Sequence, residues 1–145
     1  MFGIKEQLDT GFIKIKYMKT KKNLGIWMDH SVAHMMELSN DEITSSSIES
    51  EFTHAEKEHL LSKSENIMHN AEQHQQHKYY KKIKEAIKDY GHVVLFGPTT
   101  AKNELSNLIK TDHLFENIKI DVQQADKMTE NQQHAFVKHH FNTAL

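Results

Sequence analysis

The chain has 145 residues, of which 37% are hydrophobic and 26% are charged, and its formal net charge is −2 at pH 7. This length suits one domain with a sizeable core and is short for two. The sequence contains no cysteine, which excludes disulfides, cysteine-based zinc or iron–sulfur sites and thiol catalysis. No apolar run approaches the roughly 18 residues that span a bilayer, and the N-terminus lacks the apolar run of a secretory signal. We therefore expect a cytoplasmic protein without a membrane partner.

Charge is unevenly distributed along the chain. Residues 5–22 contain six lysines and two acids, residues 37–72 contain nine acids and two lysines, and residues 78–88 contain five lysines and one acid. Arginine is absent, so bidentate arginine contacts to phosphate or guanine are excluded. The pattern rules out a uniformly basic nucleic-acid binder but leaves local basic patches. We expect no DNA partner.

We interpret residues 1–22 as an N-terminal extension and residues 23–145 as a single domain. The stretch Met18-Lys-Thr-Lys-Lys22 resembles a natural start ahead of the first strong strand. It favours a disordered extension or a misplaced start for residues 1–17, and the alternative is a short added strand at residues 12–17.

Three strands are predicted next, at residues 24–28, 33–38 and 43–51. The turn-forming residues Ser39-Asn-Asp-Glu42 separate the second strand from the third. Short links between consecutive strands are typical of an antiparallel meander.

The second half of the chain alternates between helical and strand patterns. Residues 54–90 contain no glycine or proline and favour a helix, with an apolar face at Tyr80, Ile83, Ile87 and Tyr90 and a stop at Gly91. A buried strand at residues 92–96, a helix from residue 101, a strand within residues 115–122 and a final helix after the capping box Thr129-Glu-Asn-Gln132 complete the chain. Phe136, Val137 and Phe141 of the final helix are expected to face the core. The order βββαβαβα predicts an α/β fold with a mixed sheet flanked by helices.

Gly97-Pro-Thr-Thr-Ala-Lys102 is a candidate phosphate-binding segment. Backbone N–H groups at a helix start, the hydroxyls of Thr99 and Thr100 and the ammonium of Lys102 are suited to an anion. The second glycine and the Lys-Ser/Thr pair of a Walker A loop are missing. The alternative is a strand-to-helix turn capped by Thr99 or Thr100.

Lys78-Tyr-Tyr-Lys-Lys-Ile-Lys84 is a candidate RNA-binding segment. Lys78, Lys81 and Lys82 are candidate contacts to backbone phosphates, with Tyr79 stacking on a base. The alternative is an amphipathic helix that turns Tyr80 and Ile83 inward and leaves its lysines in solvent.

Metal and catalytic signals are sparse. Asp29 ends the first strand, where a metal-dependent nuclease of the RNase H type has a carboxylate, but such chemistry needs several converging carboxylates. The alternative is that Asp29 caps the turn through Ser31. His74 and His77 have the spacing of a helical ligand pair, without a His-Glu-x-x-His pattern or an acid to complete a site. No Gly-x-Ser-x-Gly elbow is present. We expect no resident metal or cofactor and no enzymatic activity.

Four pieces of sequence follow one another in an informative order: Ile26-Trp-Met-Asp-His30, Val93-Val-Leu-Phe-Gly-Pro98, Ala101-Lys102 with Glu104-Leu105, and Asp126 to Gln132 before the last helix. In this order and spacing, which cover about four-fifths of the chain, they resemble the middle domain of archaeal and eukaryotic peptide-chain release factors and Pelota, and in particular small bacterial stand-alone versions called translational machinery proteins. The resemblance implies an RNase H-like fold: a five-stranded mixed sheet of order 3-2-1-4-5 flanked by helices.

Release factors of that family use a Gly-Gly-Gln loop after the third strand to promote peptidyl-tRNA hydrolysis, whereas Pelota-like rescue proteins lack it. The corresponding residues 52–76 contain no glycine, so Gln73, Gln75 and Gln76 do not form that motif. The resemblance therefore implies ribosome association without hydrolysis.

Three hypotheses follow. The first is a non-enzymatic protein that associates with ribosomes or structured RNA, in stalling, hibernation or stress, through Lys78, Lys81, Lys82 and Lys102. The second is an interaction module that binds another protein through the acidic helical segment 49–76. The third is a metal-dependent nuclease or phosphohydrolase built around Asp29.

Overall fold

The computed structural model describes residues 22–51 and 65–143. The predicted extension before residue 22 lies outside this range, as do residues 52–64 of the acidic segment. In chain order the elements are β1 (Asn23–Met28), β2 (Val32–Ser39), β3 (Glu42–Glu49), α3 (Glu65–Ile87), β4 (His92–Gly97), α4 (Ala101–Lys110), the 3₁₀ turn η1 (His113–Phe115), β5 (Lys119–Gln124) and α5 (Glu130–Thr143). None of the described helices is long and apolar enough to cross a membrane.

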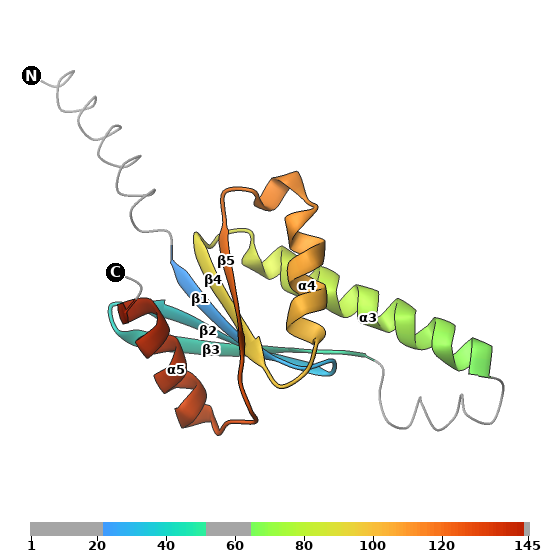
Figure 1. Cartoon of the computed structure of the whole chain (residues 1–145), viewed down its shortest axis with the longest axis horizontal. Helices are drawn as coiled ribbons and strands as arrows, with labels where there is room; N and C mark the ends of the chain where they lie inside the picture. The colour runs from blue at the N-terminus through green and yellow to red at the C-terminus, as the bar shows by residue number, and fades with distance from the viewer. Residues whose placement is uncertain (1–21, 52–64, 144–145) are drawn as a thin grey trace, which may run out of the picture.

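The strands form one five-stranded mixed sheet of order β3-β2-β1-β4-β5. β2 is antiparallel to β1 and β3, whereas β4 is parallel to both β1 and β5. Figure 1 shows the sheet with helices on both sides. The α/β class, the strand order and the flanking helices are confirmed.

The predicted turn between the second and third strands is a tight hairpin. Ser39 pairs with Glu42, so Asn40 and Asp41 form a two-residue loop. Both have positive φ, of 53° and 65°. Two such residues give a turn whose twist matches that of the flanking strands, and asparagine and aspartate tolerate this conformation.

Element boundaries differ from the predictions by a few residues. β2 begins at Val32, one residue before the predicted start of this strand at residue 33. The last strand begins at Lys119 because Phe115 belongs to η1, whose start is capped by the Asp112 carboxylate accepting the Leu114 N–H at 3.0 Å. The strand thus starts inside the predicted range 115–122 and ends two residues beyond it, at Gln124.

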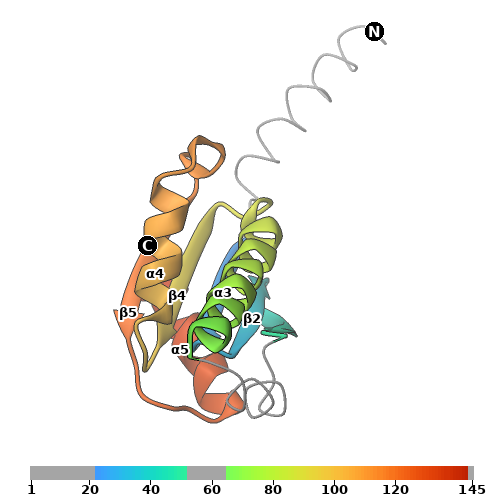
Figure 2. The same ribbon diagram turned by 90° about the vertical axis from the view of Figure 1, so that its right-hand side faces the viewer.

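The sheet is buried on both faces at its centre. Figure 2 shows α3 and α4 together over one face, with α5 on the other side. The side chains of β1 and β4 alternate between two cores. The core under α3 and α4 includes Leu24, Ile26, Met28, Val93, Leu95, Tyr79, Tyr80, Ile83, Leu105 and Ile109, and the core under α5 includes Trp27, Met36, Val94, Phe96, Val137 and Phe141.

The capping box at the start of α5 is formed as predicted. The Thr129 hydroxyl accepts the Gln132 N–H at 3.2 Å, and the Gln132 side-chain oxygen accepts the Thr129 N–H at 2.9 Å. This fixes where α5 begins and so which residues it turns inward. Val137 and Phe141 are buried, and Phe136 stacks on Phe96 with ring centroids 4.1 Å apart.

α5 packs closely on the sheet because β1 carries a glycine beneath it. A Cβ on Gly25 would lie 2.2 Å from Cγ2 of Val137. No side chain fits there unless α5 moves, so the distance between α5 and the sheet depends on Gly25.

We expect Gly25→Ala to reduce the free energy of unfolding by about 1–3 kcal/mol, the usual cost of overpacking a core. Urea denaturation of the wild type, G25A, V137A and the double variant measures this. Because V137A removes the methyl group that the new Cβ meets, the double variant should lose less stability than the two single variants combined. Strictly additive losses would contradict a direct Gly25–Val137 contact.

Candidate functional site

The predicted RNA-binding lysines share one exposed face of α3. Lys78, Lys81 and Lys82 are all exposed, and we call these three residues the lysine face. Their spacing of three and four residues places them on one side of the helix. The opposite side carries Tyr79, Tyr80, Ile83 and Ile87, which are 0–4% exposed. The helix therefore separates its lysines from its core-forming residues, as the amphipathic alternative also predicts.

The lysines of this segment differ in how firmly they are held. Lys82 donates to Glu51 at 3.0 Å and Lys88 to Glu85 at 2.9 Å, with lysine side chains 50% and 42% exposed. Lys84 is only 23% exposed, donates to Asp112 at 3.1 Å and lies 5.3 Å from the centroid of the Phe115 ring. In the described part of the chain, Lys78 and Lys81 have no carboxylate within ion-pair distance.

These differences rank the lysines as phosphate contacts. An exposed ion pair contributes only about 0–1 kcal/mol, so Lys82 can exchange Glu51 for a phosphate at little cost. Lys84 would have to leave a half-buried carboxylate and an aromatic ring. Among the described residues, neither Lys78 nor Lys81 has an ion pair to break, and Lys78 acts on Glu51 only through space. These two lysines are therefore the best placed of the predicted contacts.

A hollow lies between α3 and the α4–η1 side of the protein. Its α3 wall includes His77, Lys81, Lys84 and Lys88, and its other wall includes Leu108, Leu114 and Phe115. Lys81 also lines a second hollow with Lys78, Lys82, Glu51 and Glu85. Lys81 is thus common to two neighbouring depressions on the basic side of α3.

Lys102 lies inside the protein. Its side chain is 3% exposed, and its ammonium donates to the carbonyl oxygen of Thr99 and to Oε1 of Gln124, the latter at 2.8 Å. Burial lowers the pKa of Lys102. The ammonium joins the start of α4 to the end of β5, so Lys102 is not available to a phosphate at the surface. The prediction that Lys102 contacts RNA is therefore wrong.

Thr99 and Thr100 form a strand-to-helix turn, as the alternative predicts, but Thr100, the N-cap residue of α4, makes no side-chain capping hydrogen bond. The Thr99 hydroxyl accepts the Ala101 N–H at 3.2 Å, and the Thr100 hydroxyl donates to Glu104 at 3.0 Å. The helix start therefore already has a carboxylate beside it, from its own first turn. A phosphate arriving there would meet this negative charge, and the Lys102 ammonium points inward.

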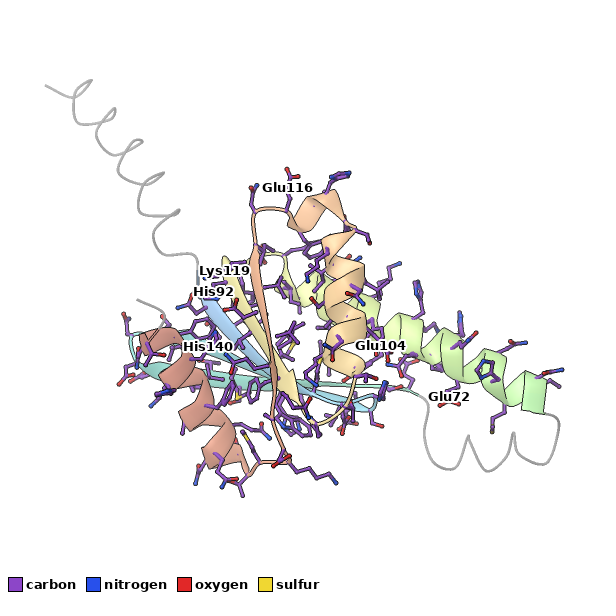
Figure 3. The ribbon with its side chains drawn as sticks, in the orientation of Figure 1. Glu72, His92, Glu104, Glu116, Lys119 and His140 are labelled. Carbon is purple, nitrogen blue, oxygen red and sulfur yellow. The ribbon has the colours of Figure 1, made fainter. Side chains whose placement is uncertain are left out.

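Glu104 is the centre of a hydrogen-bonded cluster at the carboxyl ends of β1 and β4 (Figure 3). Its carboxylate accepts from Tyr80 at 2.8 Å, from Thr100 at 3.0 Å and contacts His30 at 3.2 Å. Burial opposes its ionisation, but the hydrogen bonds from Tyr80, His30 and Thr100 outweigh this and lower the pKa of Glu104. Burial, and to a lesser degree the hydrogen bond to Glu104, raise the pKa of Tyr80.

Tyr79 is not available to stack on a base. Its side chain is 1% exposed and its hydroxyl donates to the backbone carbonyl oxygen of Asp29 at 3.0 Å. Tyr79 thus connects α3 to the residue that follows β1, and Tyr80 connects α3 to the first turn of α4. The aromatic part of the predicted RNA-binding segment is structural, and only its lysines face solvent.

The metal-ligand candidates are not brought together. One oxygen of the Asp29 carboxylate accepts the N–H groups of Ser31 at 2.7 Å and Val32 at 2.9 Å, which confirms the turn-capping alternative. His74 and His77 are exposed on α3. Among the described residues, the one group of three potential ligands whose donor atoms cluster contains none of these three residues.

Two features of this region were not predicted. Lys84 and Lys88 contribute to the hollow beside α4, and the lysine-rich run 78–88 was the signal that included them. The Glu104 cluster was missed because its members are up to 74 residues apart in sequence. No local motif joins His30, Tyr80 and Glu104.

Comparison with solved structures identifies proteins of the same fold. The chain superposes on the Pelota protein of Thermoplasma acidophilum with a TM-score of 0.51 and 14% identity, covering 85% of this chain and 32% of that one. It superposes on Archaeoglobus fulgidus Pelota with a TM-score of 0.56 and 10% identity, covering 96% of this chain and 39% of that one. The chain thus has the fold of a Pelota-like domain and spans about a third of the length of these proteins. Neither a protein-family model nor a curated protein sequence matches it.

The lowered pKa of Glu104 makes a pH-dependent prediction. Because the folded-state pKa lies below the ordinary value of 4.5, the charged carboxylate stabilises the fold above that pH, and this stabilisation is lost as the pH falls through the lower folded-state pKa. Glu104 is 46% exposed, so solvent screening limits the effect. We expect Glu104→Gln to reduce the free energy of unfolding by roughly 1 kcal/mol or less at neutral pH. The loss should shrink as the pH falls below 4.5.

Urea denaturation at neutral pH and at about pH 3 measures this difference. The matched control is Glu116→Gln, because the Glu116 side chain is 67% exposed and its one ion-pair partner among the described residues is His113, at 3.8 Å. That variant should match the wild type at both pH values. A deficit for E104Q that stays constant with pH would show that the carboxylate charge does not stabilise the fold.

Proposed function

We propose that this chain is a non-enzymatic protein that associates with the ribosome or with structured RNA and is related to translation release and rescue factors. The observation that carries the proposal is the Pelota-like fold, which agrees with the sequence motifs that resemble the same family. We assign the chain to the middle domain of that family. Its lack of a Gly-Gly-Gln loop favours a role in ribosome stalling, hibernation or stress over peptide release.

The lysine face supplies the physical basis for RNA contact. Lys78 and Lys81 are exposed and have no ion pair among the described residues, and Lys82 is held only by a solvent-exposed pair with Glu51. Lysine binds phosphate as a point charge and does not read base edges. Recognition through this face would follow the backbone shape of a structured RNA, and its affinity would depend steeply on salt.

The competing hypotheses have less support. The carboxylate of Asp29 is engaged by the turn that follows it, and the described residues place no second carboxylate with it in a metal-binding group. For the protein-partner hypothesis, the described part of segment 49–76 consists of its first three residues and the first half of α3. We retain protein binding as the outcome to be considered if RNA association fails.

The direct test is sucrose-gradient sedimentation of the tagged full-length chain in lysate, from growing and starved cells, at low and high salt. We expect wild-type protein to migrate with a ribosomal particle at low salt, to be released at high salt and to move to the top of the gradient after RNase treatment. The double variant K78A/K81A should migrate at the top at low salt. With purified particles, the slope of log affinity against log salt should fall by about 1 for each phosphate contact removed.

The matched control is K127A/K138A. It removes the same charge from the loop before α5 and from α5 itself, on the side of the sheet opposite α3, and should leave sedimentation unchanged. If both double variants lost binding equally, the loss would depend on the net charge of the protein, and the assignment of Lys78 and Lys81 as the RNA contacts would be wrong. Wild-type protein that stays at the top of the gradient in every condition would overturn the proposal.

A further inference from the structure

Three polar side chains converge at the end of the sheet away from Glu104. His92 begins β4, Asp121 lies in β5, and His140 lies near the end of α5 (Figure 3). Oδ2 of Asp121 lies 2.6 Å from Nε2 of His92 and 2.9 Å from Nε2 of His140. One donor atom from each residue lies within 4.8 Å of the other two. Three separate elements thus direct two imidazoles and a carboxylate at one point.

The cluster is partly enclosed and its rings are held in place. The side chains of His92, Asp121 and His140 are 17%, 28% and 12% exposed. The Phe141 ring packs edge-on against both imidazoles, with centroids 4.9 Å and 5.2 Å away. Burial opposes ionisation of Asp121, but the hydrogen bonds from both histidines outweigh it and lower the pKa of this carboxyl. The carboxylate thus lies between the two imidazoles, with one of its oxygens close to both rings.

A fourth residue, Gln123, contacts the ring nitrogen of His140 that faces away from Asp121. The side-chain amide of Gln123 lies 3.1 Å from this nitrogen, Nδ1. A glutamine amide can donate to a bare Nδ1 or, after a half-turn, accept from Nδ1–H. When the amide oxygen accepts from Nδ1–H, Nε2 of His140 has no proton, and its lone pair can bind a metal. Metal-binding histidines commonly have such a carbonyl partner on the second ring nitrogen.

We propose that His92, Asp121 and His140 bind one divalent transition-metal cation of the zinc class, through Nε2, Oδ2 and Nε2 respectively. Metal–ligand distances of about 2.0–2.1 Å in a tetrahedral site require donor atoms about 3.3 Å apart. To meet this, the 2.6 Å distance from Asp121 to His92 would widen by about 0.7 Å and the 2.9 Å distance to His140 by about 0.4 Å. Two imidazoles disfavour magnesium and calcium, which prefer oxygen ligands. The partial exposure leaves a fourth position for water.

One charge opposes the site. The Lys119 ammonium acts on Asp121 through space and favours its ionised form, so it also repels a bound cation. Lys119 is exposed, and solvent screens its charge. A bound metal would connect α5 to β4 and β5 in place of the two hydrogen bonds that connect them now. It would therefore stabilise the packing of the C-terminal helix, independently of the proposed RNA association through α3.

The test is zinc binding by the metal-free, untagged full-length chain, measured by isothermal titration calorimetry and by competition with a chromophoric chelator. We expect one site per chain that binds at least ten-fold more tightly than any other. H92Q/H140Q keeps side chains of hydrogen-bonding character without imidazole and should lose at least ten-fold in affinity. Zinc should raise the melting temperature of the wild type and not that of this variant. Substituted cobalt should give the visible absorption of a four- or five-coordinate site.

The chain contains twelve histidines, so the control must separate this cluster from accidental sites. H74A/H77A removes an exposed pair at helical spacing and should leave the tight site unchanged. Gln123→Ala should weaken binding by a smaller factor than the loss of the two imidazoles. The proposal is overturned if the wild type binds no zinc. It is equally overturned if H92Q/H140Q, shown by circular dichroism to be folded, binds zinc as tightly as the wild type.

Discussion

The central constraint of this structure is the burial of β1 and β4 on both faces. Val93 to Phe96 are fully buried, and β1 is nearly so. A pair of strands with no solvent face must be covered on both sides. α3 and α4 cover one side and α5 the other.

The ends of these two strands are therefore the places where polar groups can gather. The Glu104 cluster forms at their carboxyl ends, and His92 begins the histidine cluster at the opposite end of β4. Gly25 completes the arrangement because Val137 of α5 packs against β1 at a position where β1 has no side chain.

Apolar pattern was enough to predict most of the fold. The run Val93 to Phe96, the stripe of Tyr80, Ile83 and Ile87 and the capping box at Thr129 each depend on neighbours in sequence, and each is confirmed. The inward orientation of Lys102 could also be predicted from the sequence, because position 102 lies on the same side of α4 as the buried residues Leu105, Ser106 and Ile109. A lysine at a helix start suggests an anion site, but the helical period places this lysine on the buried side of α4. The partner of Lys102, Gln124, could not be predicted from the local sequence because it lies 22 residues away.

The distribution of charge separates two kinds of polar surface. At the carboxyl ends of β1 and β4, hydroxyl, imidazole and backbone donors already satisfy Glu104 and Asp29, and the nearby ammonium of Lys102 is turned inward. Such a cluster stabilises the turn between sheet and helix and leaves little for a ligand. On α3 the position is reversed, because Lys78 and Lys81 face solvent and, among the described residues, have no ion pair. A polar partner gains most where the protein has not satisfied its own charges.

The chain shares its fold with the two Pelota structures although only 10–14% of the residues are identical. The features that preserve it are patterns, such as apolar alternation, a hairpin turn and a helix cap, and many sequences can supply them. Binding residues are particular side chains, and fold similarity does not transfer them. The lysine face and the histidine cluster must therefore be judged on their own geometry. The lysine face lies on α3, whereas the histidine cluster is formed by β4, β5 and α5, the helix on the opposite side of the sheet. Loss of one should leave the other intact, because no described contact links them.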